Sequence, residues 1–350
     1  MVPAPNDQRW RVSAFTRVSW RDGTIEITSS TSNITLLASD ARILDLVHFF
    51  ARPKYIVEVV DAWAHLPRSE VIACIDELID ARVLVTETSV EPTHWDPTAL
   101  AYHQLSRSGS PVADGEESAC THVPGSGPPL IPLGPPAPPR NRDFADVLIH
   151  RRSTRAWPKC AIERSTFSTL LSMSAANRSD PFLLDDGSTS RPYPSGGAVY
   201  SLELYPVIDT DAIDSVDAGV YRYRPDHHAL ELLAAGAAAS KPFLTSAAEA
   251  VGTGRPPVVL VISSRIASQS QAYHQIAYSL VLKEVGALFQ TLYLVCEFLG
   301  LSACALGGGS PDGALAELRG EQIFDNPVVG EFALGPRGSG PARQIDGGRI

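Results

Sequence analysis

Arg151-Arg152-Ser153-Thr154-Arg155 is the first of two short runs whose residue types could do chemistry, because it alternates cations with hydroxyls over five residues. The planar guanidinium of arginine fits phosphate oxygens with paired N–H donors, and a serine hydroxyl adds one more donor. The run therefore indicates an anion site. The alternative is an ordinary helix end, where cations are common because they complement the helix dipole.

The second run, Arg191-Pro192-Tyr193-Pro194-Ser195-Gly196-Gly197-Ala198, leads directly into an apolar stretch, Val199 to Ile208. Two adjacent glycines before a strand let the backbone approach a flat ligand and direct N–H groups toward it. Proline, serine and glycine are also the usual residues of a simple turn, so this run by itself does not decide between a turn and a binding site.

Taken together, the two runs and their order resemble the nitroreductase-like flavoproteins, and more narrowly the SagB/McbC-type dehydrogenases of peptide natural-product pathways. The resemblance covers about Asp143 to Arg337. Further pieces follow in the order that the family shows: Gly219-Val220-Tyr221-Arg222-Tyr223-Arg224-Pro225 with Ala229-Leu230-Glu231, Glu284-Val285-Gly286 with Gln290, Leu299-Gly300-Leu301, and Gly307-Gly308-Gly309.

The resemblance implies an FMN-dependent oxidoreductase whose flavin lies at a homodimer interface. It implies three groups of cofactor contacts: Arg151, Ser153 and Arg155 at the phosphate and ribityl end; Pro194, Ser195, Gly196 and Gly197 along one edge of the ring; and backbone groups of Leu306, Gly307 and Gly308 near N5. Gln290 on a long helix and Arg337 after the last strand are two further candidate contacts, the second with the phosphate.

The named dehydrogenases oxidise thiazoline or oxazoline rings to azoles, and a base must reach the ring proton. The family usually has a Lys-Tyr pair there, which aligns with Ala272-Tyr273 in this chain; no lysine occurs between Lys241 and Lys283. A tyrosine is a poor base at neutral pH unless a cation lowers its pKa. His274 is adjacent and titrates in the useful range. Tyr273 and His274 are therefore the candidate catalytic residues.

Three functions are compatible with these motifs. The first is azoline oxidation in a ribosomally synthesised or carrier-bound peptide, with a leader-bearing precursor and a cyclodehydratase complex as partners. The second uses the flavin in the reductive direction on an activated alkene such as dehydroalanine, or on a nitro group, and the absent lysine favours it. The third is a catalytically degenerate subunit that only binds peptide, against which the intact Arg-x-Ser-x-Arg and Ser-Gly-Gly motifs argue.

Composition limits the class of protein. With 350 residues, 44% of them hydrophobic and 19% charged, we expect a soluble globular protein of two domains. The net charge of −10 argues against a general nucleic-acid binder. The five cysteines are scattered without CxxC or metal-ligand spacing, so we expect no metal and a reduced, cytoplasmic protein. No signal sequence or membrane-spanning run is apparent.

The elements that must position the motifs alternate helices and strands over residues 142–350. Strands are expected at Val199–Ile208, Val220–Tyr223, Leu230–Leu233, Pro257–Ser263 and Val328–Leu334. Helices are expected at Glu163–Ala176, with Phe167, Leu170, Leu171 and Met173 as its apolar positions, and at Tyr278–Leu299, buried nearly all round. This predicts an α+β nitroreductase-like domain with helices packed on a mainly antiparallel sheet. No GxGxxG follows a strand, which excludes a Rossmann fold.

Residues 1–102 are expected to form a small winged-helix-like domain. Its expected elements are a hairpin over residues 12–28 around Asp22-Gly23, a strand at Ile34–Leu37, a helix capped by Ser39, helices at Tyr55–Trp63 and from Pro67, and a strand at Arg82–Thr86. The acidic third helix argues against DNA. The resemblance implies recognition of a leader peptide, which could add a strand to an exposed edge; the alternative is a domain that only dimerises or shields the catalytic half.

Residues 103–141 differ sharply in composition from both neighbours. Nine prolines lie between Pro111 and Pro139, together with glycines and serines. Such a segment cannot bury apolar surface, so we expect a semi-rigid linker between the two domains.

Overall fold

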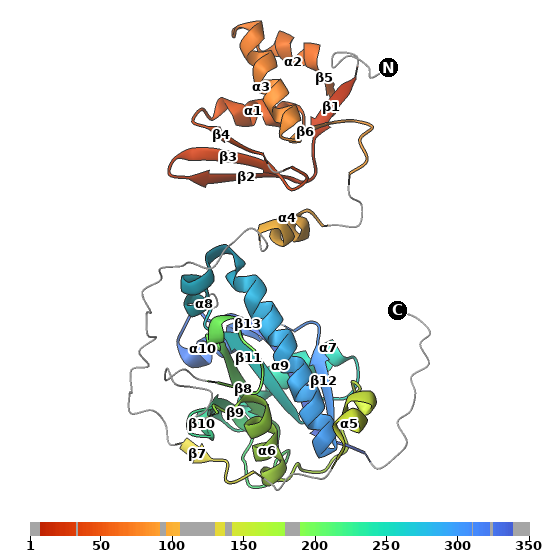
Figure 1. The fold of residues 1–350 in the computed structure, drawn as a ribbon, viewed down its shortest axis with the longest axis vertical. Helices are drawn as coiled ribbons and strands as arrows, with labels where there is room; N and C mark the ends of the chain where they lie inside the picture. Colours follow the sequence, from red (N-terminus) through yellow and green to blue (C-terminus); the bar gives the residue numbers. More distant parts are fainter. Residues whose placement is uncertain are drawn as a thin grey trace. The chain divides into compact units, whose positions relative to one another are not determined.

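A computed structural model of the chain describes residues 8–32, 34–91, 96–105, 130–136, 142–178, 190–309, 311–322 and 325–338 (Figure 1). The chain divides into two compact units, residues 1–108 and 109–350. Most of the predicted linker, residues 103–141, lies outside the described residues.

The N-terminal unit contains two three-stranded antiparallel sheets. The first, in the order β2-β3-β4, consists of Thr16–Arg21, Thr24–Ser29 and Thr35–Ala38. Asp22 and Gly23 both have positive φ, 50° and 79°, as a two-residue type I′ hairpin requires, so the predicted hairpin is confirmed. The hairpin begins at Thr16 rather than Val12, because β1 (Arg9–Val12) belongs to the second sheet with β5 (Lys54–Tyr55) and β6 (Leu84–Thr86).

Three helices complete the core of this unit: α1 (Arg42–Phe49), α2 (Ile56–Ala62) and α3 (Arg68–Asp80). Helix α3 buries Val71, Ile75 and Leu78 on one face, as its spacing predicted. The predicted cap of α1 is wrong. The N-cap position is Ala41, and the carboxylate of Asp40 instead accepts a hydrogen bond from the Arg42 backbone N–H at 2.9 Å. A further helix, α4 (Pro97–Leu105), crosses the domain boundary predicted at residue 102.

The second unit is built on a seven-stranded sheet in the order β12-β13-β11-β8-β9-β10-β7, and every pairing in it is antiparallel. The strands are β7 (Leu130–Pro132), β8 (Leu202–Ile208), β9 (Gly219–Arg224), β10 (Ala229–Ala235), β11 (Val258–Ser264), β12 (Leu301–Leu306) and β13 (Val328–Pro336). β7 lies inside the predicted linker, yet it pairs with β10, so this part of the range belongs to the second unit.

Helices cover both faces of this sheet (Figure 1). The helices are α5 (Phe144–His150), α6 (Arg164–Ala175), α7 (Ala237–Val251), α8 (Ile266–Tyr273), α9 (Ala277–Leu299) and α10 (Asp312–Arg319). One apolar cluster joins α6 and α9 to side chains such as Leu260 and Phe332, and another joins α7 and α10 to Val259 and Ala333. Adjacent strand residues therefore point to opposite faces, and the predicted α+β architecture is confirmed.

Two burial predictions are wrong. Helix α9 was expected to be buried nearly all round, but Tyr278 and Leu282 are 43% and 40% exposed, because only one face of the helix meets the sheet and α6. The helix is long and apolar enough to span a membrane by length and composition, but ten of its residues are buried in the core of this unit. Met173 is also exposed, while Phe167, Leu170 and Leu171 fill the buried face of α6.

Candidate active site

The Arg151–Arg155 run begins where helix α5 ends. Asp143 caps the start of α5 by accepting a hydrogen bond from the Ala145 N–H at 2.8 Å, and the helix closes at His150. The run then meets β12, an edge strand of the sheet, where the Thr154 N–H donates to the carbonyl of Ala303 at 2.7 Å. The run is therefore a helix end followed by a segment that is hydrogen-bonded to the edge of the sheet.

Tyr293 of α9 contacts two residues of this run, Arg151 and Ser153. The Arg151 guanidinium lies over the Tyr293 ring at 5.0 Å from its centroid, and the Ser153 hydroxyl is 2.8 Å from the Tyr293 hydroxyl. That hydroxyl also accepts from the Ala305 N–H at 2.7 Å. Among the residues that the structure describes, the guanidinium groups of Arg151 and Arg155 form no ion pair, so both charges are available to an anion.

The backbone that follows β12 is open. Gly307 and Gly308 are exposed, and no described atom lies within 4 Å of the position that a Cβ would take at either residue. Because Ala305 is tied to Tyr293, this loop starts beside the Arg151–Ser153 cluster. The structure thus places the predicted phosphate contacts and the predicted Leu306–Gly308 contacts at neighbouring points.

A buried carboxyl group lies directly beneath this glycine loop. Glu331 of β13 pairs in register with Leu306, is only 4% exposed, and touches Gly309 so closely that any side chain at residue 309 would collide with it. Burial, together with the negative charge of Asp312, raises the pKa of Glu331 to about 7. Its Oε1 has no hydrogen-bond partner among the described residues.

The Pro194–Gly197 turn lies at the other end of α9. Gly196–Ala198 form a short 3₁₀ turn in which Gly197 has a φ of 60°, and the Ser195 hydroxyl accepts from the Tyr200 N–H at 2.9 Å. The hydroxyl of Tyr273 lies directly against Gly197, where a Cβ would collide with it. The structure therefore brings the candidate catalytic Tyr273 onto the turn predicted to line the flavin ring.

Replacing Gly197 with alanine should destabilise this turn and displace Tyr273. The left-handed φ costs a residue with a Cβ about 1–2 kcal/mol, and the collision with the tyrosine adds to it. We expect a lower thermal midpoint in scanning calorimetry. Gly313→Ala is the matched control: Gly313 lies in α10 with no described atom near its Cβ position, so alanine should stabilise the protein there. Equal midpoints for both variants would contradict the strain at Gly197.

Two other candidate residues, His274 and Gln290, lie apart from the contacts described above. His274 is exposed, follows Tyr273 with a φ of 43°, and is the first residue of the 3₁₀ turn His274–Ile276 that precedes α9. Gln290 is exposed on α9, three residues before Tyr293. Neither residue has a described contact with the turn or with the Arg151 cluster, so only Tyr273 of the two catalytic candidates touches a predicted cofactor contact.

Arg337 is already engaged by a carboxylate. It donates to Glu297 at 2.6 Å and to the Leu301 carbonyl at 2.9 Å, and Glu297 also pairs with Arg142. Burial alone would raise the pKa of Glu297, but the two arginines hold it below its usual value. An arginine neutralised in this way is less available to a phosphate than Arg151 or Arg155.

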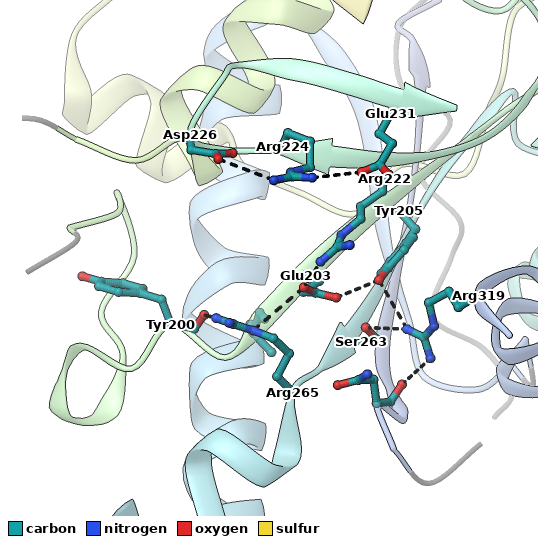
Figure 2. A network of polar contacts seen from close by, with 12 residues as sticks. Tyr200, Glu203, Tyr205, Arg222, Arg224, Asp226, Glu231, Ser263, Arg265 and Arg319 are labelled. Atoms are coloured by element: carbon teal, nitrogen blue, oxygen red, sulfur yellow. Dashed lines mark hydrogen bonds and ion pairs between the residues drawn. The ribbon is translucent and has the colours of Figure 1, made fainter. Parts of the chain in front are cut away.

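A polar network anchors the chain just after the turn (Figure 2). Arg265 donates to the Tyr200 carbonyl at 3.1 Å and lies 3.9 Å from Glu203, which is also ion-paired with Arg222. Burial would raise the pKa of Glu203, but the Arg222 charge keeps it below its usual value. The motifs in the sequence did not predict this network, although the charges spaced along β8, β9 and β10 were a signal for it.

Comparison with known proteins identifies the second unit. The model of the nitroreductase family matches residues 148–330, which is more than half of the chain. The chain belongs to the nitroreductase family. The family resemblance inferred from the motifs is therefore confirmed, and so is the nitroreductase-like fold.

Three relatives illustrate this membership. A protein of Methanocaldococcus jannaschii described as a nitroreductase is 28% identical over 170 residues, covering 46% of this chain and 77% of its own. The microcin B17-processing protein McbC of Escherichia coli is 29% identical over 150 residues, covering 42% of this chain and 55% of McbC. The crystal structure of an Anabaena variabilis protein described as a nitroreductase shares the fold, with a TM-score of 0.53 and 20% identity over 73% of this chain and 50% of that one.

Family membership makes the chain a nitroreductase-like flavoprotein related to McbC. The motifs that carried the resemblance lie within or close to the matched residues, whereas the residues that organise them were not predicted. Tyr293 is in hydrogen-bond contact with Ser153, the amide nitrogen of Gln269 in α8 lies 3.3 Å from the Cβ position of Gly196, and Glu331 lies against Gly309. A glutamate inside an otherwise apolar strand was the one available signal for Glu331.

Proposed function

We propose that this protein is an FMN-dependent dehydrogenase that oxidises azoline rings to azoles in a ribosomally synthesised or carrier-bound peptide. The observation that carries the proposal is the contact between the Tyr273 hydroxyl and Gly197, which puts a proton-transfer group on the turn expected to line the flavin. The relationship to McbC, described as a microcin B17-processing protein, supports a peptide as the substrate class.

The residues present fit FMN. Two guanidinium groups that form no ion pair within the described part of the chain and the Ser153 hydroxyl make a donor set suited to a phosphate, and the open backbone of Gly307 and Gly308 leaves room for a flat ring. Arg151, Ser153 and Arg155 would hold the phosphate, while the Pro194–Gly197 turn and the Leu306–Gly308 loop would hold the ring. The flavin, when bound, supplies the hydride acceptor of the reaction.

The two clusters support a homodimer in which each flavin contacts both chains. Gly196 packs on Leu280 and Arg151 packs on Tyr293; these two positions of α9 are about 20 Å apart at the usual helical rise. The turn of one chain and the arginine cluster of its partner would face one flavin. Exposed apolar side chains on α5 and α9 offer a surface for such an interface: Phe144, Leu148, Ile149, Tyr278 and Leu282.

A groove on the N-terminal unit supports recognition of a leader-bearing precursor. A cavity of about 380 Å³ lies between β4, an edge strand, and α3; Leu37, Ala38, Val71 and Cys74 are among its lining residues. An extended peptide can add to such an edge through backbone hydrogen bonds. A complex with the cyclodehydratase that forms the azoline would deliver the substrate to the second unit.

The test is anaerobic mixing of the oxidised, FMN-loaded protein with an azoline-bearing peptide. We expect the flavin absorbance to bleach and the peptide to lose two hydrogens by mass, faster with the leader segment than without it. Reoxidation of the reduced protein by a dehydroalanine peptide, without any bleaching by azolines, would instead establish the reductase. A purified protein that takes up no FMN would overturn both activities.

Substituting Tyr273 with phenylalanine should slow flavin bleaching by about 100-fold, because loss of a proton-transfer group has effects of that order. The affinity for FMN, measured by quenching of flavin fluorescence, should stay unchanged. His274→Gln tests the second candidate: because His274 has no described contact with the turn, this variant should keep the wild-type bleaching rate. Full activity of Tyr273→Phe would remove the tyrosine from the reaction.

A further inference from the structure

Glu331 is a buried acid beneath the loop that is expected to approach N5 of the flavin. It is 4% exposed, and it pairs with Leu306 of β12 on one side and with Val261 of β11 on the other. The loop that continues from Leu306, residues 307–309, is exposed. The carboxyl group is therefore buried directly under a loop whose own backbone faces solvent.

The carboxyl group of Glu331 is packed against the last glycine of this loop. Its carbon lies 2.8 Å and its Oε1 lies 3.3 Å from the position that a Cβ would take at Gly309, and its Oε2 lies closer still. Because any side chain at residue 309 would displace the carboxyl group, the position of the acid and the path of the loop depend on each other. A change of charge at one of them is therefore felt at the other.

The surroundings of this carboxyl group favour its neutral form. Val261 belongs to the apolar cluster between the sheet and helices α7 and α10, and Oε1 of Glu331 has no hydrogen-bond partner among the described residues. The neighbours named above on β11, β12 and the loop are uncharged, whereas Asp312 at the start of α10 adds a negative charge. Burial and the Asp312 charge together raise the pKa of Glu331 to about 7. An acid in this range can change its protonation state when a further charge appears nearby.

Packing by itself does not account for an acid at this position. Val261 and Ala333 face the same side of the sheet as Glu331, and both are apolar members of the same cluster. An apolar residue at position 331 would fill this place without a buried, unpaired oxygen, which is unfavourable. The acid is better explained by the loop above it, where negative charge would appear when the flavin is reduced.

We propose that Glu331 takes up a proton from solvent when the flavin is reduced, and so compensates the negative charge that the hydride brings. The hydride carries two electrons and one hydrogen from a C–H bond of the azoline. The proton from solvent forms an O–H bond on the Glu331 carboxylate, and no electron passes through this residue. The proton that the azoline itself loses is the one assigned to Tyr273, so the two residues act on different protons. This inference rests on the proposed function for its cofactor.

Proton uptake during photoreduction tests this coupling without any azoline. The FMN-loaded protein is reduced anaerobically by light and an electron donor in weakly buffered solution, and a pH indicator counts the protons. At pH 8 the wild type should take up about one proton more per flavin than Glu331→Gln, because its carboxyl group is ionised before reduction. At pH 5 the carboxyl group is protonated in both states, so the two proteins should take up equal numbers. Glu317→Gln, an exposed glutamate of α10, is the matched control and should behave like the wild type at both pH values.

The midpoint potential of the bound flavin gives a second readout. From pH 7 upward it should fall with pH about twice as steeply in the wild type as in Glu331→Gln, because two protons rather than one accompany the two electrons. Equal proton counts in the wild type and Glu331→Gln at pH 8 would overturn this inference and leave the proposed function standing. A wild-type protein that binds no FMN would overturn both.

Asp312→Asn keeps the test decisive if Glu331→Gln does not fold. The Asp312 carboxylate accepts a hydrogen bond from the Val328 N–H at 2.9 Å, and the amide oxygen of asparagine can accept the same bond. Without the Asp312 charge the pKa of Glu331 should be lower, so the extra proton uptake should begin at a lower pH than in the wild type. An unchanged onset in Asp312→Asn would mean that another group takes up the proton.

Discussion

Replacing Arg151 and Arg155 together with glutamine should lower the affinity for FMN by about 100-fold or more. Each substitution removes a charge-assisted contact with the phosphate, and such contacts contribute about 1.5–3 kcal/mol each. Glutamine keeps the apolar stem of the side chain, so the packing of Arg151 on Tyr293 is partly preserved. The measurement is titration of the apoprotein with FMN, followed by flavin fluorescence.

Arg152→Gln is the matched control for this double variant. It removes one positive charge from the same run, but the Arg152 guanidinium donates to the His150 carbonyl, whereas that of Arg151 packs on Tyr293. We expect its FMN affinity to stay close to that of the wild type. A free-energy loss in the control half as large as that in the double variant would mean that the run attracts FMN only by its net charge.

Glu331→Gln should remove a large pH dependence of stability. The folded protein raises the pKa of this carboxyl group from 4.5 to about 7, so the folded state binds its proton more tightly than the unfolded state does. The stabilisation is fully present below pH 4.5 and is lost as the pH rises toward 7. At 1.36 kcal/mol per pKa unit, the loss amounts to about 3 kcal/mol.

Urea unfolding of the full chain at pH 5 and pH 8 measures this effect, with hydrogen exchange of the β13 amides reporting on the second unit. The wild type should be less stable at pH 8 than at pH 5, and Glu331→Gln should lose most of that difference. Glu317→Gln, an exposed glutamate of α10, should behave like the wild type. A wild-type dependence retained in Glu331→Gln would show that the carboxyl group is ionised throughout this range.

Local patterns predicted most of the elements. The turn residues Asp22-Gly23, the apolar run of β11 and the spacing of Val71, Ile75 and Leu78 each depend on neighbours a few residues away. The elements that were missed, such as β12, α7 and α10, lack such contrast with the surrounding sequence. The burial of α9 was overestimated because an apolar composition does not say how many faces of a helix meet a partner.

The candidate site also has a part that the sequence predicts and a part that it does not. The sequence by itself determined which residue types form the Arg151–Arg155 run, the glycine turn and the glycine loop, because each motif is a short run of neighbouring residues. It also determined that the expected lysine is absent. The nitroreductase family followed from those motifs and is confirmed by the match to residues 148–330.

Only the tertiary structure decided how these motifs meet other parts of the chain. Tyr293 lies 140 residues after Ser153 and Glu284 lies 83 residues after Ser201, yet each pair is in hydrogen-bond contact. Arg337 was a candidate phosphate contact by sequence, and the structure instead pairs it with Glu297. Such contacts depend on sheet register and helix packing, which bring together residues that are far apart in the sequence. The sequence around one partner therefore does not indicate which residue the other partner is.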